Sequence, residues 1–297
     1  MACVRPLPDT VIVASRGAGL AFSFASTTGA LAGSGAMAYG NAIGSIICNT
    51  ALIAAISITC NPGPVNVKSM KTPAIFFFCS AALYCVAAYF LGTFPRWMGF
   101  VMLAIFVAYT ILTVRNGLKN PDQVEEEEEE GGKERKLWQE LLLLVVGAGV
   151  IAVGADLLVE HGQVIAIELG VPETVVALLF VALGTSLPEL VTTITSLKKG
   201  RASLGVGNVI GANVFNLVLV SGVAVSLAPF DVPAESILRG TVLNMSKVVD
   251  IPVMLGVMVL MAVPALLRKK LGRWQGIALL GIYIAFCVCQ FTMAVPA

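Results

Sequence analysis

Charged residues are scarce in this chain. Asp, Glu, Lys and Arg make up 12% of its 297 residues, and there is a single His. Hydrophobic residues make up 57%, and the mean hydropathy is +0.89. This composition excludes an ordinary soluble protein and indicates a chain that crosses a membrane many times. The net charge of +1 gives no sign of a nucleic-acid partner, and we expect none.

Motifs of common catalytic and metal sites are missing as well. The sequence contains no G-x-x-x-x-G-K-[ST] phosphate loop, no H-E-x-x-H and no G-x-S-x-G. Its seven Cys form no C-x-x-C pair and lie mostly within or beside apolar runs. We therefore expect no enzyme and no cofactor, and we interpret the cysteines as small packing residues.

Long apolar runs are abundant instead. A bilayer core about 30 Å thick needs roughly 20 apolar residues per helix. A weaker run, Thr10–Gly33, is rich in small residues and carries Arg16, so it is a ninth span at most. The sequence thus predicts an all-α membrane protein, a bundle of about 8–9 transmembrane helices. The eight clear runs are Ala36–Thr59, Pro73–Phe94, Trp97–Val114, Leu137–Val159, Thr174–Leu197, Ala202–Ala228, Val248–Leu267 and Arg273–Val295.

Positive charge is divided unequally between alternate loops. One side of the predicted bundle holds fourteen Lys and Arg residues, and the other holds only Arg96, Arg239 and Lys247. Cytoplasmic loops carry the excess of Lys and Arg in membrane proteins. We therefore assign the first side to the cytoplasm and expect a multi-pass protein of the cell (plasma) membrane.

An acidic segment divides the chain into two halves. Six consecutive glutamates, Glu125–Glu130, lie between Asn120-Pro121 and a basic patch that ends at Lys136. Like charges repel and bury no apolar surface, so we interpret residues 120–136 as a solvated cytoplasmic linker. The membrane part then divides into residues 1–119 and 137–297.

A polar motif occurs once in each half. Residues Gly40–Asn49 match Gly207–Asn216 at both glycines, one Ile and two Asn, with a constant offset of 167. Four predicted helices separate the two copies, and the charge distribution makes the copies cross the membrane in opposite directions. Many secondary transporters use such an inverted repeat, with the binding site near the bilayer midplane.

Oxygen-bearing side chains collect in the second half. Glu189 lies inside a predicted span, where an ionised carboxylate is expensive unless it is compensated. Pro188 loosens the helix beside the hydroxyls of Thr185 and Ser186. Asn213 and Asn216 share one face of the next helix. Such oxygen ligands suit Ca²⁺, Na⁺ or a proton.

Other polar residues have simpler interpretations. We interpret Asn41 and Asn208 as helix caps or packing links, and His161 as a surface residue. Asp156 and Asp250 lie near helix ends, where snorkelling or capping is a sufficient explanation.

The two motifs resemble the cation/calcium antiporter superfamily, which includes the sodium/calcium exchangers. Gly184–Leu190 and Gly207–Asn216 are similar to its second alpha repeat, and Gly40–Asn49 to part of the first. The resemblance implies an inverted-repeat helix bundle of the sodium/calcium exchanger type with a central cation site. It also implies six ligands: Thr185, Ser186, Glu189 and Asn216 from the second repeat, and Ser45 and Asn49 from the first.

The first repeat departs from the family pattern. The offset of 167 places Phe22 opposite Glu189, so the expected first-repeat carboxylate is absent, and Ala212 stands opposite Ser45. Two explanations remain open at this stage: a shortened or misjoined chain, which we favour, or a site with altered selectivity.

The leading hypothesis is therefore a secondary active transporter that exchanges Ca²⁺ or a related cation for Na⁺ or H⁺ by alternating access. Glu189 would be the charged ligand, and the other five residues would be neutral ligands. The alternatives are a truncated or degenerate, non-transporting membrane scaffold of the same fold and, less favoured, a channel.

Overall fold

The computed structural model describes residues 35–119, 172–198, 202–234, 236–239 and 241–296, together with single residues between 146 and 170. The expected span Thr10–Gly33, the acidic linker and the bulk of Leu137–Val159 lie outside these ranges. Within them, six helices are long and apolar enough to cross a membrane, and the bent pair Glu173–Thr185 and Leu187–Lys198 is a seventh if it is counted as one span.

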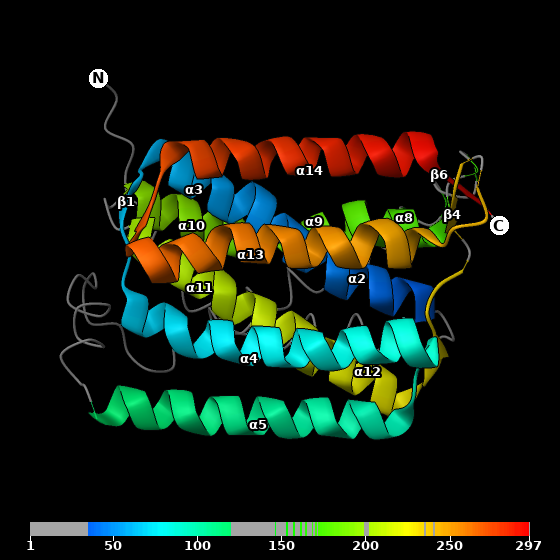
Figure 1. The fold of residues 1–297 in the computed structure, drawn as a ribbon, viewed down its shortest axis with the longest axis horizontal. Helices are drawn as coiled ribbons and strands as arrows, with labels where there is room; N and C mark the ends of the chain where they lie inside the picture. The colour runs from blue at the N-terminus through cyan, green and yellow to red at the C-terminus, as the bar shows by residue number, and fades with distance from the viewer. Residues whose placement is uncertain are drawn as a thin grey trace.

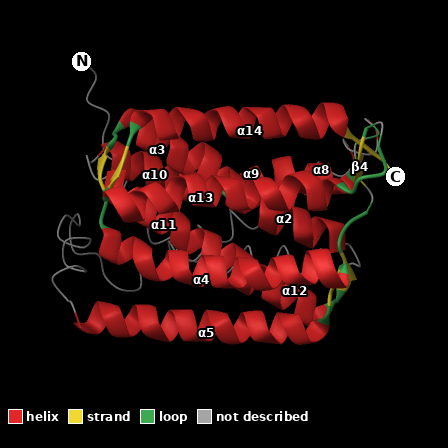
Figure 2. Cartoon of the chain, viewed as in Figure 1, coloured by secondary structure: helices red, strands yellow, loops and turns green. Residues whose placement is uncertain are grey.

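The described part is almost entirely helical (Figures 1 and 2). Each copy of the repeat is one long helix interrupted by a π-helical segment. The first comprises α2 (Gly35–Cys48), η1 (Asn49–Ala54) and α3 (Ala55–Cys60), and the second comprises α11 (Ala202–Val214), η4 (Phe215–Val220) and α12 (Ser221–Leu227). The other helices are α4 (Val67–Val86) with η2 (Ala87–Leu91), α5 (Arg96–Lys119), α8 (Glu173–Val176) with η3 (Ala177–Val181) and α9 (Ala182–Thr185), α10 (Leu187–Lys198), η5 (Ser246–Asp250) with α13 (Ile251–Arg268), and α14 (Arg273–Met293).

One predicted span starts in the wrong place. The apolar run predicted a start at Pro73, but helix α4 begins at Val67 and contains Pro73. Asn66 caps this helix, because its Oδ1 accepts hydrogen bonds from the backbone N–H groups of Lys68 (3.1 Å) and Ser69 (3.4 Å). The cap satisfies donors that no carbonyl of the helix reaches, so the helix begins before the apolar run does.

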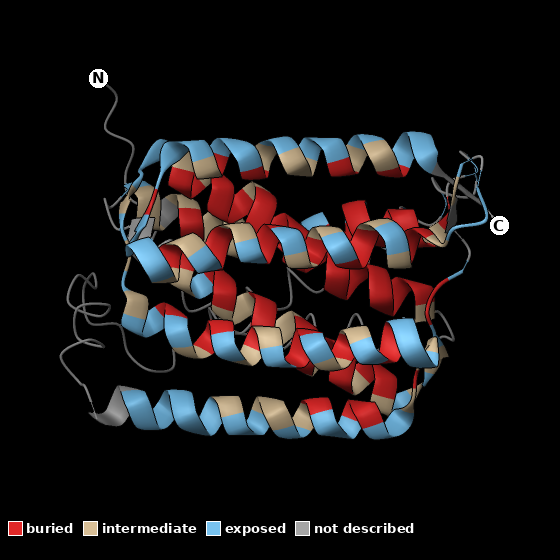
Figure 3. Ribbon diagram, in the orientation of Figure 1, coloured by how far each residue is buried: buried red, intermediate tan, exposed pale blue. Residues whose placement is uncertain are grey.

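The repeat helices form the core, and the other helices surround them. In the most apolar window of each span, 78% of the first repeat helix and 61% of the second are buried, against 17% of α5 and 22% of α14. Figure 3 shows the same contrast between the red inner helices and the pale blue outer ones. Exposed side chains such as Phe100 and Ile284 point outward from α5 and α14, as expected of helices that face lipid.

Two glycines of the outer helices lie against equivalent positions of the two repeat helices. A Cβ atom on Gly276 of α14 would lie 2.8 Å from the Ala55 oxygen and the Thr59 nitrogen, and one on Gly99 of α5 would lie 2.8 Å from the Gly222 oxygen and 2.5 Å from the Ser226 nitrogen. Gly222 and Ser226 correspond to Ala55 and Thr59 through the offset of 167. Each repeat helix therefore packs backbone to backbone against an outer helix of its own, in the same way.

Three short antiparallel strand pairs hold the loops at the two ends of the bundle. The pair β1 (Gly63–Pro64) with β5 (Lys270–Leu271) lies at one end, where Lys68 and Arg273 also lie (Figure 1). The pairs β2 (Thr93–Phe94) with β3 (Phe230–Asp231) and β4 (Ser236–Leu238) with β6 (Ala294–Pro296) lie at the other end. The repeat helices run in opposite directions between these ends, which confirms the predicted inversion.

Candidate functional site

The helix that carries Glu189 is broken at Ser186. Helices α9 and α10 meet there at a bend of 43°. Ser186 has φ −93° and ψ 0°, and its N–H is shared between the carbonyls of Ala182 and Leu183 at 3.1 Å each. Pro188 is the second residue of α10, where a missing N–H costs nothing because helix-starting N–H groups have no carbonyl partner. Glu189 follows in the first turn, at the positive end of the helix dipole.

Hydroxyl groups of the two halves meet beside this break. Ser45 Oγ lies 3.0 Å from Thr185 Oγ1. Thr185 Oγ1 also donates to Asn41 Oδ1 at 2.9 Å, and Ser45 Oγ lies 3.4 Å from the same oxygen. Helix α2 approaches closely here, since a Cβ on Gly44 would lie 2.7 Å from Ala182 Cβ and from Leu178 Cα. The glycine of the first copy thus permits the contact between Ser45 and Thr185.

A second polar contact joins the repeat helices directly. Asn49 Nδ2 donates to Asn213 Oδ1 at 3.2 Å, and Asn213 Nδ2 donates to Thr50 Oγ1 at 2.7 Å. Asn213 Nδ2 also lies 3.2 Å from Met258 Sδ of α13. Asn49, Thr50 and Asn213 are each 0% exposed, so this network lies in the interior of the bundle.

Three of the six predicted ligands keep a buried oxygen without a hydrogen-bond partner among the described residues. These atoms are Asn49 Oδ1, Ser186 Oγ and Glu189 Oε2. The elements that carry them are in contact, because α10, which follows Ser186 and carries Glu189, packs against η1, which begins at Asn49. Buried polar atoms normally have partners, since an unpaired one costs roughly 1–3 kcal/mol. Three partnerless oxygens in one region therefore fit a positively charged occupant.

The sixth predicted ligand lies at the matching point of the second repeat helix. Asn216 is half-buried, and its side chain makes no hydrogen bond to the described residues. The helix changes from α to π at Asn49 in the first copy and at Phe215, the residue before Asn216, in the second. π-Helical turns are rare and frequently mark functional sites. Both asparagines thus stand where their helix is locally widened.

The candidate ligands carry little negative charge. In the described ranges, no three His, Cys, Asp or Glu side chains come together as a metal site. Among the described side chains, Glu189 is the one carboxylate near the neutral oxygens of Ser45, Asn49, Thr185 and Ser186. Hard oxygen ligands with little charge suit a Ca²⁺ or Na⁺ ion that is bound and released, rather than a permanently held metal.

Two interpretations of polar residues need correction or completion. Asn41 is no cap, because α2 begins six residues before it, but it is a packing link, being 6% exposed and bonded to Thr185. Asp250 neither caps nor snorkels: it is 1% exposed, makes no side-chain cap, and its Oδ1 accepts from Gln290 Nε2 at 2.6 Å. Sequence reasoning missed Thr50 and Met258, and the one available signal was that Thr50 directly follows Asn49.

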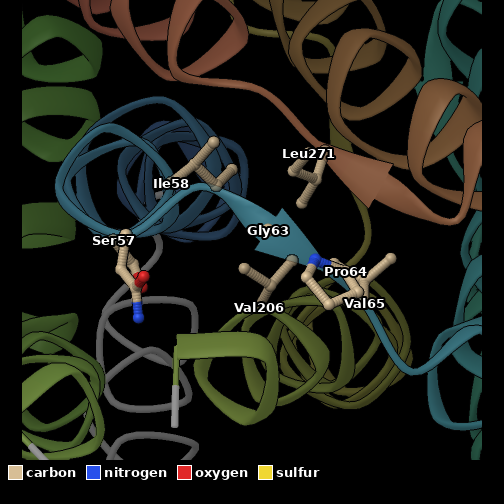
Figure 4. A pocket seen from close by; sticks show the side chains of 8 residues that line it. Ser57, Ile58, Gly63, Pro64, Val65, Val206 and Leu271 are labelled. Carbon is tan, nitrogen blue, oxygen red and sulfur yellow. The ribbon is translucent and has the colours of Figure 1, made fainter. Parts of the chain in front are cut away.

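A small cavity lies at the end of the bundle that carries the β1–β5 pair. Figure 4 shows side chains of α3, β1, α11 and β5 around it, including Ser57, Val206 and Leu271. Its volume of about 10 Å³ is room for one water molecule. Such a water would give the buried Ser57 hydroxyl the partner it lacks. Ser57 follows Asn49 by about two helical turns, so the cavity is separate from the predicted ligands.

Known proteins resemble this chain over nearly its whole length. An uncharacterized membrane protein of Methanocaldococcus jannaschii is 30% identical over 247 residues, which are 82% of this chain and 74% of the relative. The sodium/calcium exchanger MaX1 of Methanosarcina acetivorans is 33% identical over 153 residues, 52% of this chain and 41% of the relative. Among solved structures, the sodium-calcium exchanger NCX_Mj soaked with Na⁺ and Sr²⁺ matches with a TM-score of 0.65 at 27% identity, covering 94% of this chain and 86% of that one.

The family assignment follows from the match to a family model. The model described as sodium/calcium exchanger protein matches residues 11–115 and 140–292. These ranges include both copies of the repeat, the break at Ser186 and the helices that surround them. The fold, the inverted repeat and this match agree, and the chain belongs to the sodium/calcium exchanger family, whose members are multi-pass membrane transporters of cations.

Proposed function

We propose that this protein exchanges Ca²⁺ or a related cation for Na⁺ or H⁺ by alternating access, at a site formed by Ser45, Asn49, Thr185, Ser186, Glu189 and Asn216. The observation that carries the proposal is the group of partnerless buried oxygens on Asn49, Ser186 and Glu189. A cation among them supplies the positive charge that each of these acceptors lacks.

Competition for one carboxylate couples the two ions. Glu189 is the single charged ligand of the set, so an ion that occupies it excludes another or weakens its binding. The hydroxyls of Ser45 and Thr185 bond to each other across the two halves, and a cation bound between the halves would compete for these oxygens. Residues 1–119 and 137–297 each contribute one copy of the repeat, and a relative movement of the copies exposes the site first to one side of the membrane and then to the other.

The surrounding membrane is proposed to be the plasma membrane, with residues 120–136 in the cytoplasm. The positive loops support this orientation, because Lys68, Lys198, Lys270 and Arg273 belong to the β1–β5 end of the bundle, where α5 ends at Lys119 directly before the linker.

Replacement of Glu189 tests the proposal. In proteoliposomes with an outward Na⁺ or H⁺ gradient, Glu189→Gln is expected to reduce calcium uptake and calcium affinity by roughly 10- to 100-fold, because a charged oxygen ligand contributes about 1.5–3 kcal/mol. Asp231→Asn is the matched control, since it makes the same chemical change on an exposed strand residue. Uptake by Glu189→Gln equal to that of the control would refute the proposed site.

Equilibrium binding separates transport from a scaffold role. The purified wild-type chain is expected to bind calcium at a saturable site that Glu189→Gln weakens. A scaffold of the same fold would show no saturable site in either protein. Imposing Na⁺ and H⁺ gradients in turn then identifies the counter-ion.

A further inference from the structure

A second buried carboxyl group lies outside the proposed cation site. Asp250 ends the π-helical segment η5 and is 1% exposed, and Gln290 of α14 is also 1% exposed. Gln290 Nε2 donates to Asp250 Oδ1 at 2.6 Å. Both residues are near the end of the bundle that carries β2–β3 and β4–β6, and neither is among the six proposed ligands.

The hydrogen bonding of this pair is incomplete in a specific way. Asp250 Oδ2 and Gln290 Oε1 are both buried and have no partner among the described residues. Both oxygens are hydrogen-bond acceptors when the carboxyl group is ionised, so neither can donate a hydrogen bond to the other. A proton on Oδ2 turns that oxygen into a donor. The acid and the amide can then form two parallel hydrogen bonds, in which every polar atom of the pair has a partner.

The surroundings favour a neutral carboxyl group. The titratable side chains around Asp250 are Tyr39 of α2, Tyr84 and Tyr89 of the α4–η2 helix and Cys289 of α14. None of them is a cation, and Tyr39 donates its hydroxyl to the Ser246 carbonyl at 3.2 Å. Lys247, one turn earlier in η5, forms no ion pair with Asp250 in the described structure. An ionised carboxylate without a cation partner is expensive at this depth.

We propose that Asp250 and Gln290 form a proton-binding site in the outer half of the membrane, separate from the cation site. A proton fits this site better than a metal ion, because Ca²⁺ takes six to eight oxygen ligands, whereas two partnerless oxygens are available on the pair. Met258, which contacts Asn213, follows Asp250 by about two turns along the same helix. Release of the proton therefore acts on the helix that packs against the repeat contact.

Infrared spectroscopy of the purified full chain in lipid nanodiscs tests this proposal without measuring transport. The wild type is expected to show the C=O stretch of a protonated carboxylic acid, which shifts in D₂O. Asp250→Asn should lose this band, whereas Glu189→Gln should keep it. Gln290→Leu removes the partner and should shift the band, and it gives the answer even if Asp250→Asn is not recovered as folded protein.

Thermal stability as a function of pH gives an independent measurement. Asn supplies an N–H where the proton would be, so Asp250→Asn should melt with the wild type at low pH and above it at high pH, where the wild type loses the proton. Asp250→Leu should melt below both at low pH. An unchanged acid band in Asp250→Asn and Gln290→Leu would overturn the proposal, as would a band that NaCl removes at constant pH, since the latter indicates a metal ion.

Discussion

Asn49 and Asn216 are equivalent residues that offer amide oxygens instead of charged ones. In the proposed site, Glu189 is therefore the one negatively charged ligand among the six. A second carboxylate on either asparagine would lower the energy of a bound Ca²⁺. Two unit charges about 4 Å apart interact by about 4 kcal/mol at an effective dielectric constant near 20, and the burial of the new carboxylate offsets part of this.

At this scale we predict that Asn216→Asp binds calcium about tenfold or more tightly than the wild type, because a net gain of about 1.4 kcal/mol is tenfold in affinity. Calorimetry on purified protein measures the effect. Asn208→Asp is the control, since Asn208 is exposed on the same helix. Equal affinities for the two variants would show that Asn216 is remote from the bound ion.

The sequence predicted some of the polar residues that meet in the bundle and missed others. The ligand hypothesis for Ser45 and Thr185 came from a motif and a resemblance, and the structure brings these two hydroxyls within 3.0 Å, although their role as ligands stays a prediction. The pairing of Asp250 with Gln290 had no sequence signal. The two residues are 40 positions apart on separate helices, and only the packing of those helices brings them together.

At the scale of elements, the close approach of α2 to η3 and α9 brings the two halves into contact. Gly44 permits this approach, and its neighbour Ser45 makes the contact with Thr185. Gly207 and Gly211 have the same spacing in the second copy as Gly40 and Gly44 in the first, but the contact differs. In the second copy, a Cβ on Gly207 or Gly211 would meet only side-chain ends, at 3.4 and 3.5 Å, within the described residues.

The prediction for this element is that Gly44→Ala destabilises the protein by about 1–3 kcal/mol, the usual cost of overpacking, and weakens cation binding by separating Ser45 from Thr185. Gly256→Ala is the matched control on α13, because a Cβ there meets nothing within 4 Å. The melting temperatures of the two variants in detergent measure the difference in stability. A Gly44→Ala protein as stable as Gly256→Ala would mean that the helices do not need this close contact.

Helix boundaries were less predictable than helix existence. The apolar run of α4 was found, but its start was placed at Pro73, where the apolar residues begin, and the helix begins at Val67. The cap at Asn66 decides the start, and capping depends on the local backbone as well as on residue type. Likewise, the break at Ser186 followed from Pro188, whereas the changes to π-helix at Asn49 and Phe215 had no sequence indicator.

At the scale of the whole molecule, the bundle has two chemically different ends. The β1–β5 end carries most of the Lys and Arg residues of the described loops, and the β2–β3 end carries few. The repeat and the charge count predicted this arrangement from sequence because both signals extend over many residues. A different residue at any single position would change the repeat or the charge count very little.

Sided labelling checks the orientation. In a background with all seven cysteines replaced by Ala, Asp231→Cys in β3 is expected to react with a membrane-impermeant maleimide in intact cells, because we assign its end to the outside. Lys270→Cys in β5 is the opposite-end control and should react only after the membrane is permeabilised. Both residues are exposed. The reverse pattern would invert the orientation and place the acidic linker outside the cell.

The β1–β5 pair also joins the first repeat helix to the hairpin between α13 and α14. Val65 N donates to the Lys269 carbonyl at 3.0 Å beside this pair, and Arg273 Nε donates to the Thr59 carbonyl at 3.1 Å. The end of the first repeat helix at Cys60 is thus hydrogen-bonded to the hairpin between α13 and α14. If the repeats move as proposed, we expect these three helices to move together, with the pivot on the far side of these hydrogen bonds, toward the π-helical turn at Asn49.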